Sequence, residues 1–217
     1  MNTQKPSNHG GYDRAEVLIE GNHIYFKGDV ENSSVLQLIK AIKKYNTDIE
    51  NNRKFITTDF LTKYKDDKDH KDKLLNLKLG IVPDPIYLHI MSYGGSILAA
   101  MSAIDAIKNS KIPIYTVIDG FAASAGTMMS VMGKKRYMTS HSYALIHQLS
   151  SSAWGTMQTL IDSHENHKMF MERIKKIYIE KTKLTPEELE EQLKHDIWWD
   201  IDTCIAKGLV DEIYTDC

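Results

Sequence analysis

The stretch Gly120-Phe121-Ala122-Ala123-Ser124-Ala125-Gly126 decides how the rest of the chain is interpreted. It follows the apolar run Ile112 to Ile118, whose alternating β-branched residues predict a buried strand. It precedes Thr127 to Met132, which is typical of the start of a buried helix. Ser124 is therefore expected at a strand-to-helix junction with small neighbours, where the free N–H groups of a helix start face any developing negative charge. The same pattern also fits a tightly packed crossing without chemistry.

The composition indicates one soluble domain of ordinary size. The 217 residues can bury a sizeable core, and 42% hydrophobic and 26% charged residues are typical of globular proteins. A net charge of −2 provides no basic field for nucleic acid. The polar residues 1–14 lack a signal-peptide core, and no apolar run reaches membrane-spanning length. The two cysteines, Cys204 and Cys217, favour a reduced compartment. We therefore expect a cytoplasmic protein that binds neither nucleic acid nor membrane.

Two successive units of strand, Gly-containing turn and helix predict a parallel sheet. A strand over Ile86 to Met91 leads into the turn Ser92-Tyr93-Gly94-Gly95-Ser96, and a nearly uncharged helix follows over 97–107. Both turns then lie at the carboxyl ends of neighbouring strands, where α/β proteins place their sites. Elsewhere we expect a hairpin of residues 15–20 and 23–28 and strands over 136–139 and 143–148. We also expect a helix capped by Asn32 or Ser33, and helices over 157–181, from Pro186 and over 201–207.

Residues 48–80 differ from their surroundings because charges of both signs crowd together, most densely from Lys63 to Lys73. Such a run is usually a solvated helix face or a mobile loop, and a partner-binding insertion is the alternative. We expect a flexible arm at 1–14 and a single domain over 15–217, with an insertion at about 48–80.

His147 is the histidine best placed to act with Ser124. It follows the apolar residues Tyr143 to Ile146, where it is either a satisfied edge residue or a general base for a serine in the preceding turn. No histidine pair has the spacing of a metal site. His164 and His167, which lie on the helix expected over 157–181, are expected to face solvent or an interface. The sequence thus indicates no bound metal.

Four segments in order make the chain resemble ClpP, the proteolytic subunit of the Clp ATP-dependent serine proteases. Each is a weak signal alone, but their order is specific. They are Ser92-Tyr93-Gly94-Gly95-Ser96, the stretch around Ser124, Ala144-Leu145-Ile146-His147-Gln148, and Ala206-Lys207-Gly208-Leu209-Val210-Asp211-Glu212-Ile213. The chain departs from the family at Tyr93, where proline is common, and at 150–154, where the family is rich in glycine.

The resemblance implies a ClpP/crotonase-like α/β fold, with a head of repeated β-β-α units and a protruding helix-strand handle at about 150–182. It implies a serine endopeptidase with Ser124 as nucleophile, His147 as base and an aspartate before Gly208 as the third member. Gly95 and Ala125 would supply the backbone N–H groups of the oxyanion hole, and no cofactor is needed. It also implies stacked heptameric rings around a closed chamber, unfolded polypeptide substrates, and a hexameric Clp-type ATPase that delivers them.

Asp196, Asp200 and Asp202 are the candidates for the third member. Capping of the helix over 201–207 explains Asp200, and the dipole of that helix explains a charge at Asp202. Asp196 has neither explanation and has the family's spacing from Gly208. The bulky residues Ile197 to Trp199 follow it and are able to screen it from water. We therefore expect Asp196 to complete the triad.

Two other functions fit parts of the pattern. One is a catalytically inert ring subunit, against which a complete Ser124, His147 and aspartate set argues. The other is an acyl-CoA enzyme of the crotonase fold, which shares the paired N–H groups but needs no such triad. Labelling of Ser124 by a fluorophosphonate separates the protease from both.

Overall fold

The computed structural model describes residues 15–63 and 83–215. The arm expected at 1–14 and residues 64–82 of the charged segment lie outside the described residues, so the division into arm, domain and insertion stays a prediction. In chain order the elements are β1 (Glu16–Glu20), β2 (His23–Lys27), α1 (Asn32–Lys63), β3 (Ile86–Ser92), α3 (Ile97–Lys108), β4 (Ile114–Ala123), α4 (Ala125–Ser130), β5 (Lys135–Met138), β6 (Tyr143–Leu145), α5 (Met157–Lys181), α6 (Pro186–Leu193), β7 (Trp198–Trp199), α7 (Ile201–Ala206) and β8 (Glu212–Ile213).

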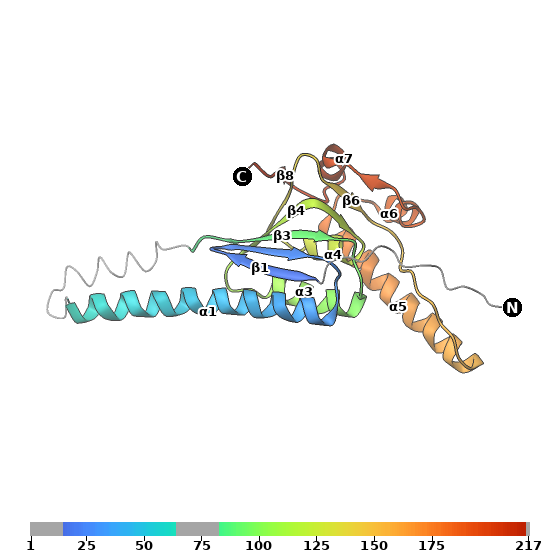
Figure 1. Cartoon of the computed structure of the whole chain (residues 1–217). Helices are drawn as coiled ribbons and strands as arrows, with labels where there is room; N and C mark the ends of the chain where they lie inside the picture. The colour runs from blue at the N-terminus through green and yellow to red at the C-terminus, as the bar shows by residue number, and fades with distance from the viewer. Residues whose placement is uncertain (1–14, 64–82, 216–217) are drawn as a thin grey trace.

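One mixed sheet forms the centre of the fold, with the strand order β1-β2-β3-β4-β5-β8 (Figure 1). β1 and β2 form the expected antiparallel hairpin, whereas β2, β3, β4, β5 and β8 run parallel to one another. Helices α1 and α3 lie along one side of this sheet (Figure 1). The parallel strands joined through helices confirm the α/β class that the repeated strand–turn–helix pattern predicts.

The hydrophobic core lies between the sheet and these helices. Burying one large apolar side chain stabilises the fold by about 1.5–3 kcal/mol. Because residues of both β3 and β4 belong to this core, the two strands are fixed relative to each other. The two glycine turns follow their carboxyl ends. Its buried members include Ile24, Phe26, Val35, Leu38, Ile42, Leu88, Ile90, Ala100, Ile104 and Ile118.

β4 is longer than the sequence indicates and β6 is shorter. β4 continues past Ile118 to Ala123, because it changes neighbour on the same edge of the sheet. Its first half pairs with β5, and Phe121 to Ala123 pair with β6. The change occurs near Gly120, whose φ of 81° lies in a region that favours glycine. β6 ends at Leu145, so His147 lies two residues beyond the strand rather than at its end.

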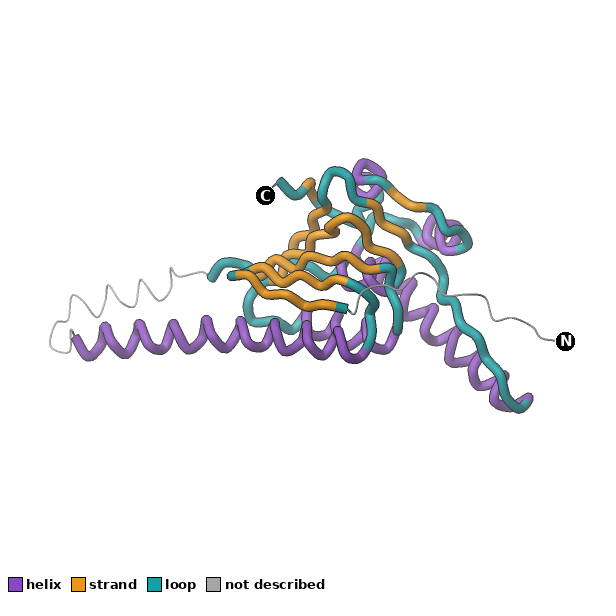
Figure 2. The backbone as a smooth tube through the Cα atoms, in the orientation of Figure 1, coloured by secondary structure: helices purple, strands orange, loops and turns teal. Residues whose placement is uncertain are grey.

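Helix α1 begins at Asn32, at one of the two positions predicted for its cap, and runs to Lys63, so residues 48–63 continue this helix. Val35, Leu38 and Ile42 from its first part are buried in the core. Its distal part extends beyond the sheet (Figure 2). Glu50 lies 3.4 Å from Lys54 and 2.9 Å from Lys111, and such pairs suit a solvated helix face. Residues 48–63 are therefore helical, and the insertion at about 48–80 stays a prediction.

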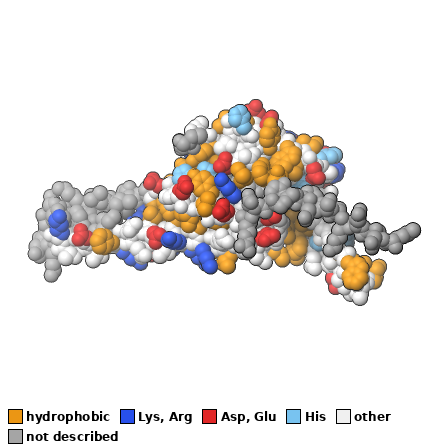
Figure 3. Space-filling view, in the orientation of Figure 1, with side chains coloured by type: hydrophobic (Ala, Val, Ile, Leu, Met, Phe, Trp, Pro, Cys, Tyr) orange, Lys and Arg blue, Asp and Glu red, His pale blue; other side chains and the backbone are white. Residues whose placement is uncertain are grey.

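Helix α5 has the predicted bounds and projects away from the head (Figure 1). Its carboxyl half packs on the core through Ile174, Ile177 and Tyr178, which are buried. In its amino half Met157 is 74% and Ile161 is 44% exposed. Figure 3 shows hydrophobic side chains gathered at this free end of the helix. The preceding segment 146–156 contains no strand, so the described part of the expected handle is a helix with a loop.

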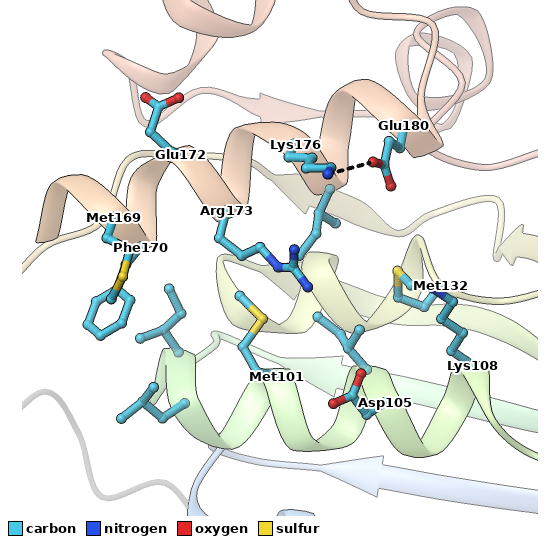
Figure 4. A pocket seen from close by; sticks show the side chains of 14 residues that line it. Met101, Asp105, Lys108, Met132, Met169, Phe170, Glu172, Arg173, Lys176 and Glu180 are labelled. Atoms are coloured by element: carbon cyan, nitrogen blue, oxygen red, sulfur yellow. Dashed lines mark ion pairs between the residues drawn. The ribbon is translucent and has the colours of Figure 1, made fainter. Parts of the chain in front are cut away.

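A groove lies between α3 and α5. Its volume is about 680 Å³, and Leu98 on its wall is 61% exposed. Figure 4 shows Met101 of α3 and Arg173 of α5 pointing into the space between the two helices. Apolar side chains thus form much of this groove, and charged side chains such as Lys108 and Glu172 contribute to its lining.

The carboxyl-terminal segment is tied to the sheet by Arg136 of β5. Its guanidinium pairs with the Asp211 carboxylate and donates to the carbonyls of Lys181 and Gly208. Burial raises the pKa of the Asp211 carboxyl. The hydrogen bonds and the positive charge of Arg136 together lower it by more than burial raises it, so this pKa lies below its usual value. This contact joins the end of α5 to the chain after α7, on either side of Asp196.

Candidate active site

Ser124 lies at the junction between β4 and α4, as the sequence predicts. Its φ of 53° and ψ of −121° make it the one non-glycine residue with positive φ among the described residues. A residue held in such a conformation carries about 1–3 kcal/mol of strain and is typical of functional sites. The Ser124 N–H donates to the Leu145 carbonyl at 3.0 Å, so the neighbouring strand β6 helps to hold the junction. The hydroxyl makes no capping hydrogen bond to α4 and stays available.

His147 and Asp196 form a hydrogen-bonded pair. The His147 Nδ1 lies 2.9 Å from the Asp196 Oδ1, and the two side chains are 24% and 76% exposed. The prediction that Ile197 to Trp199 screen Asp196 from water is therefore wrong for this chain. Ile197, which follows Asp196, is itself 57% exposed.

The other two aspartates have the helix-start positions that the sequence predicts. The Asp200 Oδ1 accepts from the Thr203 N–H at 2.9 Å and caps α7, and the hydrogen bonds with Thr203 lower the pKa of Asp200. Asp202 lies in the first turn of α7. Of the three candidates, the structure brings Asp196 to His147.

A small cavity is lined by the predicted nucleophile, base and oxyanion-hole residues. Ser124, His147, Gly95 and Ala125 all line it, and its volume is about 50 Å³. No hydrogen bond joins the Ser124 hydroxyl to His147 in the part of the chain that the structure describes. Catalytic hydrogen bonds are often long before substrate binds, so this spacing does not exclude proton transfer.

The glycine turn after β3 approaches Ser124 closely. A Cβ on Gly94 would lie 2.7 Å from the Ser124 Cβ, and one on Gly95 would lie 2.5 Å from the Val30 carbonyl oxygen. Both glycines also have positive φ, 103° and 145°. The Gly94 N–H donates to the buried Ser92 Oγ at 3.0 Å. Only glycine fits both positions, and the turn is thereby fixed against the serine.

Two residues that the sequence gives no catalytic reason to select lie behind Ser124. Thr127 Oγ1 donates to the Ser124 carbonyl at 2.7 Å, and the Tyr178 hydroxyl lies 2.7 Å from Thr127 Oγ1. Burial raises the pKa of Tyr178 above its usual value, although the Thr127 hydrogen bond lowers it, so this hydroxyl remains protonated. In the sequence Tyr178 is one more member of the apolar stripe of α5. Its hydroxyl, a polar group within that stripe, was the available signal.

Within residues 15–63 and 83–215, no group of three or more His, Cys, Asp or Glu side chains could hold a metal ion. None of the described helices is both long and apolar enough to cross a bilayer.

Comparison with known proteins decides the family. The family model for Clp protease matches residues 37–216. The chain belongs to the Clp protease family. It is a serine endopeptidase, and its α/β sheet with helices is the ClpP fold, as the sequence predicts.

Named relatives of this Clp protease come from several bacteria. The chain is 35% identical over 145 residues to "ATP-dependent Clp protease proteolytic subunit 1" of Chlamydia caviae. The matched region covers 65% of this chain and 76% of the relative. The protein of the same name in Chlamydia muridarum is 34% identical over 145 residues, with 65% and 76% covered. "ATP-dependent Clp protease proteolytic subunit" of Streptococcus pyogenes serotype M1 is 30% identical over 132 residues, with 59% and 67% covered.

Proposed function

We propose that this chain cleaves peptide bonds with Ser124 as nucleophile, His147 as general base and Asp196 as the group that orients His147. One observation carries the proposal: an uncapped serine at a strained junction lines the same cavity as a histidine that is 2.9 Å from a carboxylate. A nucleophile, a base and an orienting carboxylate are the parts that acyl transfer to serine requires.

In this mechanism His147 takes the proton of the Ser124 hydroxyl as its oxygen attacks the scissile carbonyl carbon. The Nδ1–H of His147 donates to Asp196, which fixes the tautomer that leaves Nε2 free to accept that proton. The tetrahedral oxyanion accepts hydrogen bonds from the N–H groups of Gly95 and Ala125. His147 then protonates the leaving amine, and water hydrolyses the acyl-enzyme by the same steps.

A pair of histidine variants tests this assignment. His147→Ala should lower kcat for a short fluorogenic peptide by at least about 10³-fold, as triad knockouts do. His141→Ala, on the exposed turn before β6, should leave kcat unchanged. Equal activity of the two variants would remove His147 from the mechanism.

We further propose that the chain assembles with copies of itself, as stacked heptameric rings around a closed chamber. The exposed apolar amino half of α5 and the groove between α3 and α5 support this, because monomeric proteins rarely leave large connected apolar surfaces in water. Ile161→Glu should reduce the native mass of the particle, whereas Asn166→Glu, on an exposed position of the same helix, should not. An unchanged particle for Ile161→Glu would contradict this role of α5.

A Clp-type hexameric ATPase that delivers unfolded polypeptides is the proposed partner, since the relatives are named as subunits of ATP-dependent proteases. A cluster of aromatic rings on the sheet face away from α1 and α3 supports a protein contact. Tyr25 stacks on His89 with ring centroids 4.5 Å apart, and His23 stacks on Tyr87 at 5.0 Å. Burial lowers the pKa of His89 to about 4, although Asp119 raises it, so this ring is neutral at pH 7.

The variant Tyr87→Ala tests whether the aromatic cluster contacts the ATPase without taking part in peptide hydrolysis. It should lower ATPase-dependent degradation of a protein substrate and leave hydrolysis of a short peptide unchanged. Equal loss of both activities would mean that the aromatic cluster is structural.

A cytoplasmic location is proposed on the state of Cys204. This thiol is fully buried and forms no disulfide among the described residues, and burial raises its pKa to about 12, so it remains protonated. A free buried thiol suits a reduced compartment. Cell fractionation followed by immunoblotting checks the location.

A further inference from the structure

The hydroxyl groups of Tyr178 and Thr127 form a short chain that ends on the Ser124 carbonyl. Thr127 Oγ1 lies 2.7 Å from the Ser124 carbonyl oxygen and 2.7 Å from the Tyr178 hydroxyl oxygen. Thr127 and Tyr178 are 0% and 1% exposed, so these hydroxyls are shielded from bulk water. Thr127 belongs to α4, whereas Tyr178 comes from α5, 51 residues further along the chain. The hydroxyl chain thus ties α5 to the junction that carries Ser124.

The distances favour one direction for these hydrogen bonds. Burial raises the pKa of Tyr178, so its hydroxyl keeps its proton and can donate it once. Thr127 Oγ1 is 2.7 Å from this donor and the Ser124 carbonyl oxygen is 3.5 Å from it, so the proton goes to Thr127. Thr127 in turn donates to Ser124 at 2.7 Å rather than to the Leu145 carbonyl at 3.4 Å. Both protons point toward Ser124, and hydrogen bonds in such a chain polarise one another.

The Ser124 carbonyl belongs to the same peptide group as the Ala125 N–H, one of the two proposed oxyanion donors. A peptide group is planar, and its C=O and N–H point in opposite directions. As the first residue of α4, Ala125 has no partner for its N–H within the helix, and it lines the cavity beside Ser124 together with Gly95. Groups that hold the Ser124 carbonyl therefore hold the direction of this N–H as well.

The helix by itself supplies one hydrogen bond to this peptide group. The Met128 N–H donates to the Ser124 carbonyl at 3.2 Å. A carbonyl oxygen accepts two hydrogen bonds, and Thr127 provides the second and shorter one. Ser124 has a φ of 53°, and such a conformation persists only where its surroundings hold it. The hydroxyl chain is thus a support for the Ser124 peptide group beyond the ordinary bonds of α4.

We infer that Thr127 and Tyr178 are positioning residues of the oxyanion hole. Their hydroxyl chain orients the peptide group between Ser124 and Ala125, and its polarisation strengthens the Ala125 N–H as a donor. The inference rests on the proposed roles of Ser124 and Ala125. Because this N–H meets a full negative charge only as the tetrahedral oxyanion forms, breaking the chain lowers kcat and leaves KM unchanged.

A double variant removes the chain without leaving a buried polar group unpaired. Thr127→Val and Tyr178→Phe together keep the shapes of both side chains, and replacing both partners of a hydrogen bond in this way changes stability little. We expect the folded double variant to lose about tenfold in kcat for a short peptide, the effect of one hydrogen bond, with KM unchanged. An unchanged kcat would overturn the inference.

Single variants separate the hydroxyl chain from the packing of α4. Thr127→Ser keeps the hydroxyl and should retain the activity that the double variant loses. Ser130→Ala is the matched control, because the Ser130 hydroxyl is also buried on α4 but donates to the Thr127 carbonyl at 2.9 Å, and its kcat should be unchanged. A loss in either variant as large as in the double variant would assign the effect to packing and overturn the inference. If the double variant does not fold, Tyr178→Phe alone should lower kcat with KM unchanged, and an unaltered kcat would again overturn it.

A peptide aldehyde measures the oxyanion hole directly. The Ser124 oxygen bonds to the aldehyde carbon, the C=O double bond becomes a single bond, and the hydroxyl proton passes to His147, so the aldehyde oxygen becomes an oxyanion. Its inhibition constant should rise in the double variant by about the factor that kcat falls, because both depend on the same donors. The peptide alcohol of the same sequence forms no adduct and should bind both proteins equally. Equal inhibition of the two proteins by the aldehyde would overturn the inference.

Fluorophosphonate labelling is measured alongside to distinguish two failures. A folded double variant that labels at Ser124 and keeps the kcat of the unaltered protein overturns the role of Thr127 and Tyr178 alone. Absence of labelling at Ser124 in the unaltered protein overturns the proposed nucleophile and this inference with it.

Discussion

The strand-to-helix junctions β3–α3 and β4–α4 each place a serine at the N-cap of the helix, and its hydroxyl is used differently in the two. Ser96, between β3 and α3, has an ordinary φ of −65°, and its hydroxyl accepts from the Ala99 N–H at 3.3 Å. Ser124, between β4 and α4, has φ 53° and makes no capping hydrogen bond. The first hydroxyl is occupied by the helix, and the second is free to react.

Backbone conformation accounts for this difference. At Ser124 the chain turns sharply enough to direct its hydroxyl away from the helix N–H groups, and the resulting strain is offset by neighbours. Leu145 accepts from the Ser124 N–H, and Thr127 donates to the Ser124 carbonyl. The comparison teaches that a serine before a helix keeps its hydroxyl out of the cap where other contacts hold its backbone in an unfavourable conformation.

The largest expected effect comes from removing the free hydroxyl. Ser124→Ala should lower kcat for a short peptide by about 10⁶-fold, as for other serine nucleophiles. Its free energy of unfolding should change little, because no capping bond is lost. Steady-state hydrolysis and urea unfolding measure the two quantities, and near-normal hydrolysis would contradict the assignment.

A second comparison sets the two aspartates apart. Asp196→Asn should lower kcat by about 10⁴-fold, because His147 would lose the carboxylate that fixes its tautomer. Asp200→Asn removes only a charge from the cap of α7 and should leave kcat within about twofold, since asparagine also caps helices well. Peptide hydrolysis measures both, and the reverse order of activities would assign the triad to Asp200.

The glycine turn provides an intermediate effect. Gly94→Ala places a methyl group against Ser124 and should lower kcat by about 10²-fold, as a misplacement of about 1 Å does. Gly21→Ala is the matched control, because Gly21 also has positive φ but has no atom within 4 Å of an added Cβ. It should lose only about 1–2 kcal/mol of stability. Similar kcat values for the two variants would show that the turn does not position the serine.

The smallest effect is expected at the serine that only caps. Ser96→Ala should reduce the free energy of unfolding by about 1 kcal/mol, the usual contribution of a helix cap. Its kcat should remain within a few-fold of normal. A loss of kcat comparable to that of Ser124→Ala would mean that the two junctions are not functionally distinct.

The sequence predicts the parts of this site that depend on local patterns. The small residues around Ser124, the apolar runs before both turns and the helix caps at Asp200 and Thr185 all appear where residue types indicate them. The structure also pairs His147 with Asp196, the aspartate that the family resemblance and the elimination of the two helix-start aspartates together predict.

The remaining features depend on packing between distant segments. The extension of β4 to Ala123 arises because β6 pairs with it. The hydrogen bonds of Tyr178 with Thr127 and the Ser124 carbonyl arise because α5 packs next to this junction. The exposure of Asp196 depends on how the segment between α6 and β7 turns, which Ile197 to Trp199 do not specify. Local periodicity contains no information about such contacts.

The central claim is that Ser124 is an activated nucleophile and Ser96 is not. Incubation with a fluorophosphonate, followed by digestion and mass spectrometry, measures the modified residue directly. We predict modification of the peptide containing Ser124, its loss in His147→Ala, and no modification at Ser96. A protein that is folded and unmodified at Ser124, or modified equally at both serines, would contradict the account.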